Sequence, residues 1–357
     1  MNKHFKITVV SIILLLSLNG FSQVILNADG EGDTYELINS VLAPGRDAVE
    51  GPDCSHTSFG RHIDEVFDTK LNTNVFQFHI HKTPDDDRCR NSDRQRNEIK
   101  TYNLSPDNLK GTEGETVIYK WKFKLDTDFQ PSKNFTHIHQ LKAVGGSEDK
   151  MPLITLTLRK GNPDQLELRY AESTSQTTLD KVDLSLFKGK WIAVTETITY
   201  GESGKYAISM TKVDGGAELF SYTNTNIRTW KTNADFIRPK WGIYRSLNDV
   251  DNLRDEIVRF ANFSIEETDG SLAIDDNLLE KIVLYPNPTT DAIAIKGLSS
   301  KSFDKVIIYN TLGKMVISST IKKDSLIDVS FLKEGVYFLR LKNKNQSIKN
   351  IMFLKEN

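Results

Sequence analysis

The chain has 357 residues, of which 38% are hydrophobic and 26% charged, and its formal net charge is −2 at pH 7. These values are typical of a folded globular protein and exclude extended disorder and a long coiled coil. The small net charge excludes a general attraction to nucleic acid, so an anionic ligand has to be bound by a local cluster of cations.

The first 22 residues predict a secretory signal peptide. Lys3 and Lys6 precede an apolar run over residues 7–18, and Gly20 and Ser22 fit the small residues before a signal-peptidase site. The apolar run is too short to span a membrane. We therefore expect an exported protein, not a transmembrane one, from which residues 1–22 have been removed.

Residues 23–267 predict one large β domain. Short alternating or β-branched runs, separated by Gly, Asn, Asp and Pro, occur at 74–81, 115–125, 135–142, 152–159, 165–171, 190–200, 205–213, 240–247 and 258–266. No long amphipathic helix is predicted, and residues 105–111 form at most a helical turn. The pattern favours an all-β fold, an antiparallel β-sandwich of the jelly-roll, concanavalin-like type.

Residues 268–281 are acidic and polar and predict a linker, after which residues 282–357 predict a second, small β-sandwich. From composition alone this module could be a carbohydrate-binding domain. The motifs LYPNPTTD (284–291), YNTLGKMV (309–316) and LKEGVYFLRL (332–341), in this order, resemble the C-terminal sorting domain of the type IX secretion system. The resemblance implies a Gram-negative bacterium, export through the periplasm to the cell surface or the medium, the type IX secretion machinery as partner, and removal of the module.

The two cysteines of the chain, Cys54 and Cys89, lie in loops rich in Gly, Asp, Arg and Ser. Because an exported protein can form disulfides, we expect a bridge between them that closes a loop of about 35 residues.

Three segments of the large domain are candidates for a binding face. In the stretch RQRNEIK, strand alternation places Arg94, Arg96, Glu98 and Lys100 on one face, where arginines suit carboxylate or sulfate. The alternative is a solvated outer face of the sheet.

In the segment FTHIHQLK, alternation places His137 and His139 on one face and Ile138, Gln140 and Lys142 on the other. The two histidines could bind a metal or pack between sheets, and the sequence indicates no third ligand.

In the segment KWGIYRSL, Lys240, Gly242 and Tyr244 share a face, and Arg245 points the other way unless a bulge intervenes. Gly242 would let a ligand approach the backbone closely. The alternative for Tyr244 is an ordinary core tyrosine.

The segment EGDTYE (31–36) contains acidic residues that loosely match the carboxylate set of retaining glycosidases. Such sets need a hydrophobic residue between the acids in the middle of a sandwich, so we reject a glycoside hydrolase. Asp29, Glu31 and Asp33 are a possible structural calcium site.

The three strand segments, taken in order, resemble the motifs of jelly-roll alginate lyases. The whole first domain, with residues 87–102 and 135–146, resembles the ulvan lyases of polysaccharide lyase family 28, which are related in fold to the glucuronan lyases. One departure is Lys142, which stands where the alginate lyases have a histidine. This leaves open whether His137 or His139 takes over that role.

The resemblance implies a lyase that cleaves ulvan, a sulfated uronate polymer, by β-elimination and needs no cofactor for its chemistry. It implies Tyr244 as a catalytic residue, with Lys142 either as the second catalytic group or as a neutraliser of the uronate carboxylate. The implied substrate-binding residues are Arg94, Arg96, Glu98, His137, His139, Gln140 and Arg245, and Arg88 and Arg90 are further candidates for sulfate. We expect a monomer. The alternatives are a lyase for glucuronan or alginate and a non-catalytic carbohydrate-binding protein.

Overall fold

The structure is a computed structural model that describes residues 23–268, 283–296, 305–310, 314–320, 326–342 and 347–356. The predicted signal peptide lies outside the described residues, and so does the predicted linker apart from Thr268. No helix within these ranges is long and apolar enough to cross a membrane.

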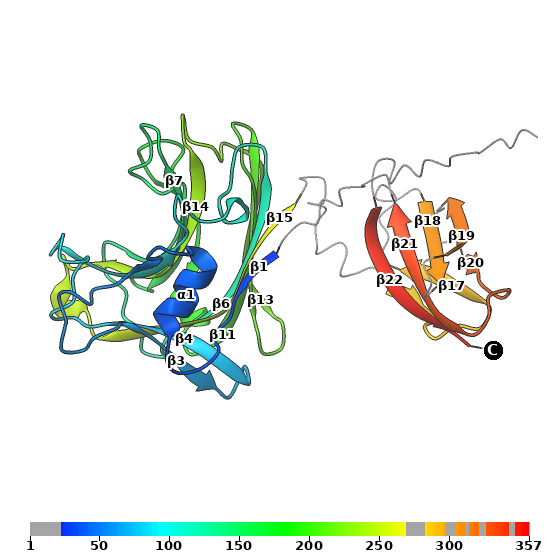
Figure 1. Ribbon diagram of the computed structural model, residues 1–357, viewed down its shortest axis with the longest axis horizontal. Coiled ribbons are helices and arrows are strands. Elements are labelled where there is room, and N and C mark those ends of the chain that lie inside the picture. The colour runs from blue at the N-terminus through cyan, green and yellow to red at the C-terminus, as the bar shows by residue number, and fades with distance from the viewer. Residues whose placement is uncertain are drawn as a thin grey trace, which may run out of the picture.

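The first domain consists of two antiparallel sheets, which confirms the predicted β-sandwich (Figure 1). The eight-stranded sheet has the order β13 (Glu218–Ile227), β12 (Gly204–Lys212), β11 (Trp191–Thr199), β6 (Thr116–Lys124), β15 (Glu256–Thr268), β4 (Thr73–Ile80) and β3 (Ile63–Asp68), with β1 (Gln23–Leu26) paired to β15. The seven-stranded sheet has the order β10 (Thr177–Asp183), β9 (Gln165–Tyr170), β8 (Ile154–Arg159), β7 (Thr136–Val144), β14 (Phe236–Ser246), β5 (Arg94–Lys100) and β2 (Val49–Glu50).

The core of the domain follows from strand alternation. On β6 every second residue is buried, so Tyr119, Trp121 and Phe123 point inward, and Trp241 and Ile243 reach them from β14. The alternate residues of the seven-stranded sheet face away from the other sheet. That outer face carries most of the polar residues that the sequence singles out.

The structure contains one helix that the sequence analysis misses, α1 (Thr34–Leu42). Thr34, Ile38 and Leu42 lie four residues apart and are all buried, so the helix packs through one narrow stripe. The short 3-10 helices are η1 (Asp107–Leu109), which confirms the predicted turn, η2 (Leu184–Leu186) and η3 (Val250–Asn252). The segment EGDTYE therefore consists of the approach to a helix and the first turn of that helix.

The C-terminal residues also form two antiparallel sheets. One contains β16 (Val283–Tyr285), β17 (Ala292–Lys296) and β20 (Leu326–Asp328), and the other contains β19 (Met315–Thr320), β18 (Lys305–Asn310), β21 (Gly335–Lys342) and β22 (Ser347–Lys355). Ile293, Ile308 and Leu339 are fully buried in a core of their own. The small β-sandwich is as predicted.

Candidate active site

The register of three neighbouring strands brings the three predicted segments together. On β14, Tyr244 lies opposite Arg96 of β5 and His137 of β7. Lys240 lies opposite Lys100 of β5 and Gln140 of β7. Segments that are up to 150 residues apart in the chain therefore form one polar surface on the outer face of the seven-stranded sheet.

Tyr244 is half-buried and held by two arginines of β5. Its hydroxyl oxygen accepts a hydrogen bond of 3.1 Å from Nη1 of Arg94, and Cζ of Arg96 lies 3.7 Å from the centre of its ring. The rings of Phe135 and His137 lie 5.1 and 5.7 Å away, centre to centre. The hydroxyl of Tyr244 therefore lies on the polar face beside two guanidinium groups.

Buried carboxylates fix the other cations of this face. Glu98 is fully buried, accepts hydrogen bonds from Arg96 (2.5 Å) and Gln140, and pairs with Nζ of Lys240 at 2.7 Å. Arg96 also donates from Nε to Asp87 at 2.8 Å. These bonds engage Nε and Nη1 of the guanidinium, and substrate binding by Arg96 stays a prediction.

Glu50 on the two-residue strand β2 is a second buried acid, and the sequence analysis missed it. It accepts hydrogen bonds from Arg88 (2.5 Å), Lys100 (2.7 Å) and Lys240 (2.6 Å). Burial would raise the pKa of Glu50, but Lys240, Lys100 and Arg96 outweigh it and hold that pKa well below its usual range. The pKa of Glu98 is lowered in the same way.

Arg238 on β14 is another cation that the sequence analysis missed. It lies opposite Lys142 of β7, and its side chain makes no hydrogen bond or ion pair with any residue that the structure describes. Alternation from Lys240 and Tyr244 could have identified it, since residues 238, 240, 242 and 244 share a face. Arg238 is therefore a cation of this face whose hydrogen-bond donors are free to bind an anion.

Lys142 is half-buried, and its Nζ donates to the carbonyl oxygens of Asp149 and, at 3.1 Å, Lys150. Burial, reinforced by Lys240, lowers the pKa of Lys142 to about 8. A neutral amine has two hydrogens and one lone pair. With both hydrogens on the carbonyls, the lone pair is free to accept a proton.

The predicted faces of β7 are wrong because the strand contains a bulge. Between His137 and His139, β7 has one more residue than its partner β8. His137 therefore shares the outer face with Gln140 and Lys142, whereas Ile138 and His139 both point into the core. The pKa of His137 falls to about 3 because of its burial, and its Nδ1 has no hydrogen-bond partner.

His139 is not a substrate-binding residue. It lies between the sheets, where Nε2 bonds Oε2 of Glu196 at 2.8 Å and Nδ1 bonds the carbonyl of Lys240 at 3.0 Å. Its ring centre lies 4.4 Å from that of Trp121. The alternative of packing between the sheets is the correct one for this histidine.

Arg245 is not a substrate-binding residue either. Strict alternation places its side chain on the face opposite to that of Tyr244, and it is fully buried. Its Nε donates to Gln95 and its Nη1 to the carbonyl of Arg254, both at 2.8 Å. Burial lowers its pKa to about 10. Its role is to join β14 to neighbouring segments within the domain.

Gly242 has a different role from the predicted one. Its φ is +144°, and a Cβ there would lie 2.1 Å from the carbonyl oxygen of Asn97. The glycine therefore lets β14 approach β5, not a ligand.

Asp29, Glu31 and Asp33 do not gather into a cluster with other side-chain ligands in the described residues. Glu65 accepts a hydrogen bond of 2.8 Å from the Gly30 amide of this loop. Burial and the charge of Asp29 raise the pKa of the Glu65 carboxyl. Calcium at this loop stays a prediction. Glu36 of the same segment pairs with Arg61 on the surface, at 2.6 Å.

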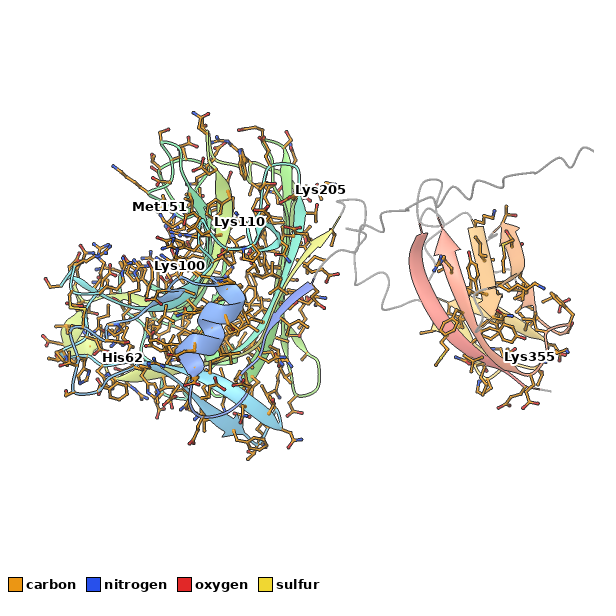
Figure 2. All side chains as sticks on the ribbon, viewed as in Figure 1. His62, Lys100, Lys110, Met151, Lys205 and Lys355 are labelled. Carbon is orange, nitrogen blue, oxygen red and sulfur yellow. A yellow bond between two sulfur atoms is a disulfide. The ribbon has the colours of Figure 1, made fainter. Side chains whose placement is uncertain are left out.

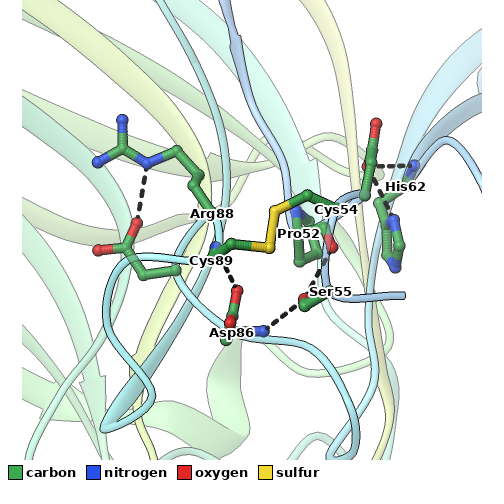
Figure 3. The surroundings of a disulfide bond; sticks show 9 residues. Pro52, Cys54, Ser55, His62, Asp86, Arg88 and Cys89 are labelled. Carbon is green, nitrogen blue, oxygen red and sulfur yellow. Dashed lines mark hydrogen bonds and ion pairs between the residues drawn. A yellow bond between two sulfur atoms is a disulfide. The ribbon is translucent and has the colours of Figure 1, made fainter. Parts of the chain in front are cut away.

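The disulfide between Cys54 and Cys89 is present, as predicted, with Cα atoms 6.2 Å apart (Figure 3). It joins the loop before β3 to the loop before β5. Arg88, next to Cys89, reaches Glu50 and Asp87. The bridge therefore fixes the loop that supplies part of the charge network.

Comparisons with known protein families match two parts of the chain. A polysaccharide lyase family model matches residues 55–264, and a model for a secretion system C-terminal sorting domain matches residues 283–355. No curated protein matches the chain.

The solved structures that are similar to the chain include a glucuronan lyase and an alginate lyase. An endo-β-1,4-glucuronan lyase from the fungus Trichoderma reesei is 19% identical, with a TM-score of 0.45 over 63% of this chain and 92% of that one. The PL-14 alginate lyase from Aplysia kurodai is 15% identical, with a TM-score of 0.47 over 68% and 98%. The family match spans more than half of the sequence, and the chain therefore belongs to the polysaccharide lyase family, with a sorting domain for secretion at its C-terminus.

Proposed function

We propose that this secreted lyase cleaves ulvan by β-elimination, with Lys142 as the base and Tyr244 as the acid. The observation that carries the proposal is the placement of Tyr244 between Arg94 and Arg96 on a face where all three motif strands meet. Glucuronan and alginate are the alternative substrates. The sorting domain supports export by the type IX route, which we propose leads through the periplasm.

The reaction needs three things from the site. The hydrogen on C5 of the uronate is weakly acidic while the neighbouring carboxylate is charged, so donors must neutralise that carboxylate. A base must take the C5 proton, and an acid must protonate the oxygen that leaves C4. The C5–H bond breaks as Lys142 takes the proton, a C4=C5 double bond forms, and the C4–O bond breaks as Tyr244 protonates the leaving oxygen. Lys142 then releases its proton to solvent, and the Tyr244 phenolate takes one up from solvent.

The residues of the polar face can fill these roles. Arg238 is unpaired and Gln140 has one amide hydrogen beyond its bond to Glu98, so both can bind the carboxylate. Lys142 has a lowered pKa and a free lone pair in its neutral form. Tyr244 presents a phenol to the leaving oxygen, and Arg94 stabilises the phenolate that results.

Sulfate on the polymer calls for cations beyond the reacting sugar. Arg90 is exposed and next to the disulfide, and Arg94 is half-buried beside Tyr244. At the other side of the face, Arg159 and Arg169 share one carboxylate, Glu167, at 3.2 and 2.9 Å. Two arginines on one acid leave a surplus of positive charge, which supports a sulfated substrate.

The test combines a polymer panel with one variant. The wild type should release unsaturated ends, seen by ultraviolet absorbance, from ulvan faster than from glucuronan or alginate. Tyr244→Phe should lower kcat on ulvan by about 10²- to 10⁴-fold, because general acid catalysis is lost, with little change in polymer binding. The matched control is Tyr222→Phe on β13 of the other sheet, which should be unaffected.

Two outcomes would contradict the proposal. Unchanged release of unsaturated ends by Tyr244→Phe would remove Tyr244 from the mechanism. Preferential cleavage of glucuronan or alginate by the wild type would replace ulvan as the substrate.

A further inference from the structure

A cluster of three histidines and one aspartate lies outside the proposed reaction. His56, His62, His81 and Asp85 each offer one ligand atom, and these atoms all lie within 4.8 Å of one another. From Asp85 Oδ1 the distances are 2.8 Å to Nδ1 of His56 and 3.3 Å to Nε2 of His62, and from Oδ2 it is 3.2 Å to Nδ1 of His81. We propose that this cluster is a structural zinc site.

The spacing of the ligand atoms suits a tetrahedral ion. Zinc binds nitrogen and carboxylate oxygen at about 2.0–2.2 Å, which separates neighbouring ligand atoms of a tetrahedron by about 3.3 Å. The oxygens of Asp85 lie 2.8–3.3 Å from one nitrogen of each ring, and the four ligand atoms lie within 4.8 Å of one another, so a small ion could draw them into this geometry. Four protein ligands leave no open position, and closed sites of this kind are structural, not catalytic.

The type of ligand selects the metal. Calcium takes six to eight oxygen ligands, and three of the four donors here are imidazole nitrogens. The two cysteines nearby are bonded to each other and offer no thiolate. Imidazole with one carboxylate suits zinc, which also has no redox chemistry that would harm an exported protein.

The surroundings orient the ligands as in known zinc sites. His62 bonds Oδ1 of Asp53 through its other ring nitrogen, Nδ1, at 2.9 Å, and this bond fixes the tautomer with Nε2 free for the metal. Asp85 accepts the backbone amide of His81 on Oδ2 at 2.6 Å. Without an ion, three ring nitrogens would converge on a single carboxylate.

Two ligands of the cluster are fully buried and two are partly exposed. The side chains of His62 and Asp85 are fully buried, whereas those of His56 and His81 are 16% and 19% exposed. Phe59 packs over the cluster, with ring centres 4.3 Å from His81 and 4.7 Å from His62. A metal would therefore enter from the side of His56 and His81.

The site supports the strand that carries the catalytic face. The inward side chain of Asn97 on β5 donates to the carbonyl of His62 at 2.8 Å, and that of Gln95 donates to the carbonyl of His81 at 2.5 Å. Arg94, Arg96 and Glu98 are the outward residues of the same strand. Figure 2 shows His62 and Lys100 at separate places of the domain, and Figure 3 shows His62 and Arg88 on opposite sides of the disulfide.

The test measures metal binding without polymer, so it is independent of the proposed reaction. Mature protein, made without a histidine tag, is treated with a chelator, dialysed, and titrated with Zn²⁺ against a competing chromophoric chelator. We expect one zinc per chain and a rise in Tm with zinc but not with Ca²⁺. His56→Ala should weaken zinc binding about 100-fold, and Asp53→Asn about 10-fold.

The matched control is His79→Ala, because His79 lies on the neighbouring strand β4 and bonds Asp64 at 3.0 Å outside the cluster. It should bind zinc as the wild type does. Circular dichroism of each chelator-treated variant verifies that it is folded, and His81→Ala serves if His56→Ala does not fold. Equal zinc affinity in wild type and in the folded cluster variant, or a Tm that responds to Ca²⁺ instead, would overturn the proposal.

Discussion

Two histidines that are two residues apart on β7 have opposite environments. His137 lies on the outer face beside Tyr244 with a free Nδ1, whereas His139 is enclosed between the sheets and bonded to Glu196. The bulge between them, not their residue type, decides which can meet a substrate. This difference allows function and stability to be separated at the scale of single residues.

We predict opposite effects for the two alanine variants. His139→Ala should lower the free energy of unfolding by about 2–4 kcal/mol, because it leaves the carboxylate of Glu196 buried with a lost partner, while kcat of the folded enzyme changes little. His137→Ala should lower kcat/KM on ulvan with a smaller loss of stability. Urea unfolding and initial rates measure both, and a reversed pattern would show that His137 is only structural.

Lys142 predicts the pH dependence of the reaction. Its pKa is lowered to about 8, so the neutral amine that can accept a proton increases as pH rises through 8. The rate kcat on ulvan should therefore rise about tenfold per pH unit below pH 8 and level off above it.

Lys142→Arg is the matched variant for this prediction. It keeps the positive charge but stays protonated throughout, so it should lose this rising limb together with most of the activity. A wild-type profile that is flat between pH 6 and 9 would contradict the role of Lys142 as base.

At the scale of elements, the close pairing of β14 with β5 creates the site. The seven register pairs from Lys240–Lys100 to Ser246–Arg94 contain no irregularity, and they place Tyr244 opposite Arg96. Gly242 permits this approach because its φ is positive and it has no Cβ. The backbone geometry of one residue therefore decides whether the two motifs meet.

Gly242→Ala should disrupt this pairing. The added Cβ would clash with the Asn97 carbonyl, so we expect a loss of about 2–4 kcal/mol in the free energy of unfolding and a large decrease in kcat. Gly201→Ala is the matched control, since a Cβ there meets no atom within 4 Å. Equal stability of the two variants would show that β14 can shift without cost.

At the scale of the whole molecule, the large domain and the C-terminal module each have a hydrophobic core of their own. All residues of the candidate site, the disulfide and the histidine cluster lie between Glu50 and Arg245. Removal of the C-terminal module should therefore leave the enzyme intact.

We predict that a chain of residues 23–268 has the kcat and KM of the longer chain (23–357) on ulvan. Its Tm should also match the transition of the large domain in the longer chain, because each core unfolds by itself. Rates and calorimetry on both chains test this. A shorter chain that is inactive yet folded would show that the module takes part in substrate binding.

The amino-acid sequence by itself determined the class of fold, the two β modules, the disulfide and the strand segments of the site. These features depend on local patterns, namely the period of two along strands, turn residues, paired cysteines and short motifs. The prediction for Arg94–Lys100 is correct because strict alternation of side chains holds along this strand in the structure.

The tertiary structure decided what local patterns do not encode. A bulge reversed the faces of His137 and His139, and a two-residue strand placed Glu50 under the cations. The cluster of His56, His62, His81 and Asp85 is assembled from loops at the ends of β3 and β4, so its spacing in the chain resembles no metal motif. Contacts of this kind depend on strand register and loop closure, which are set by the packing of the whole domain.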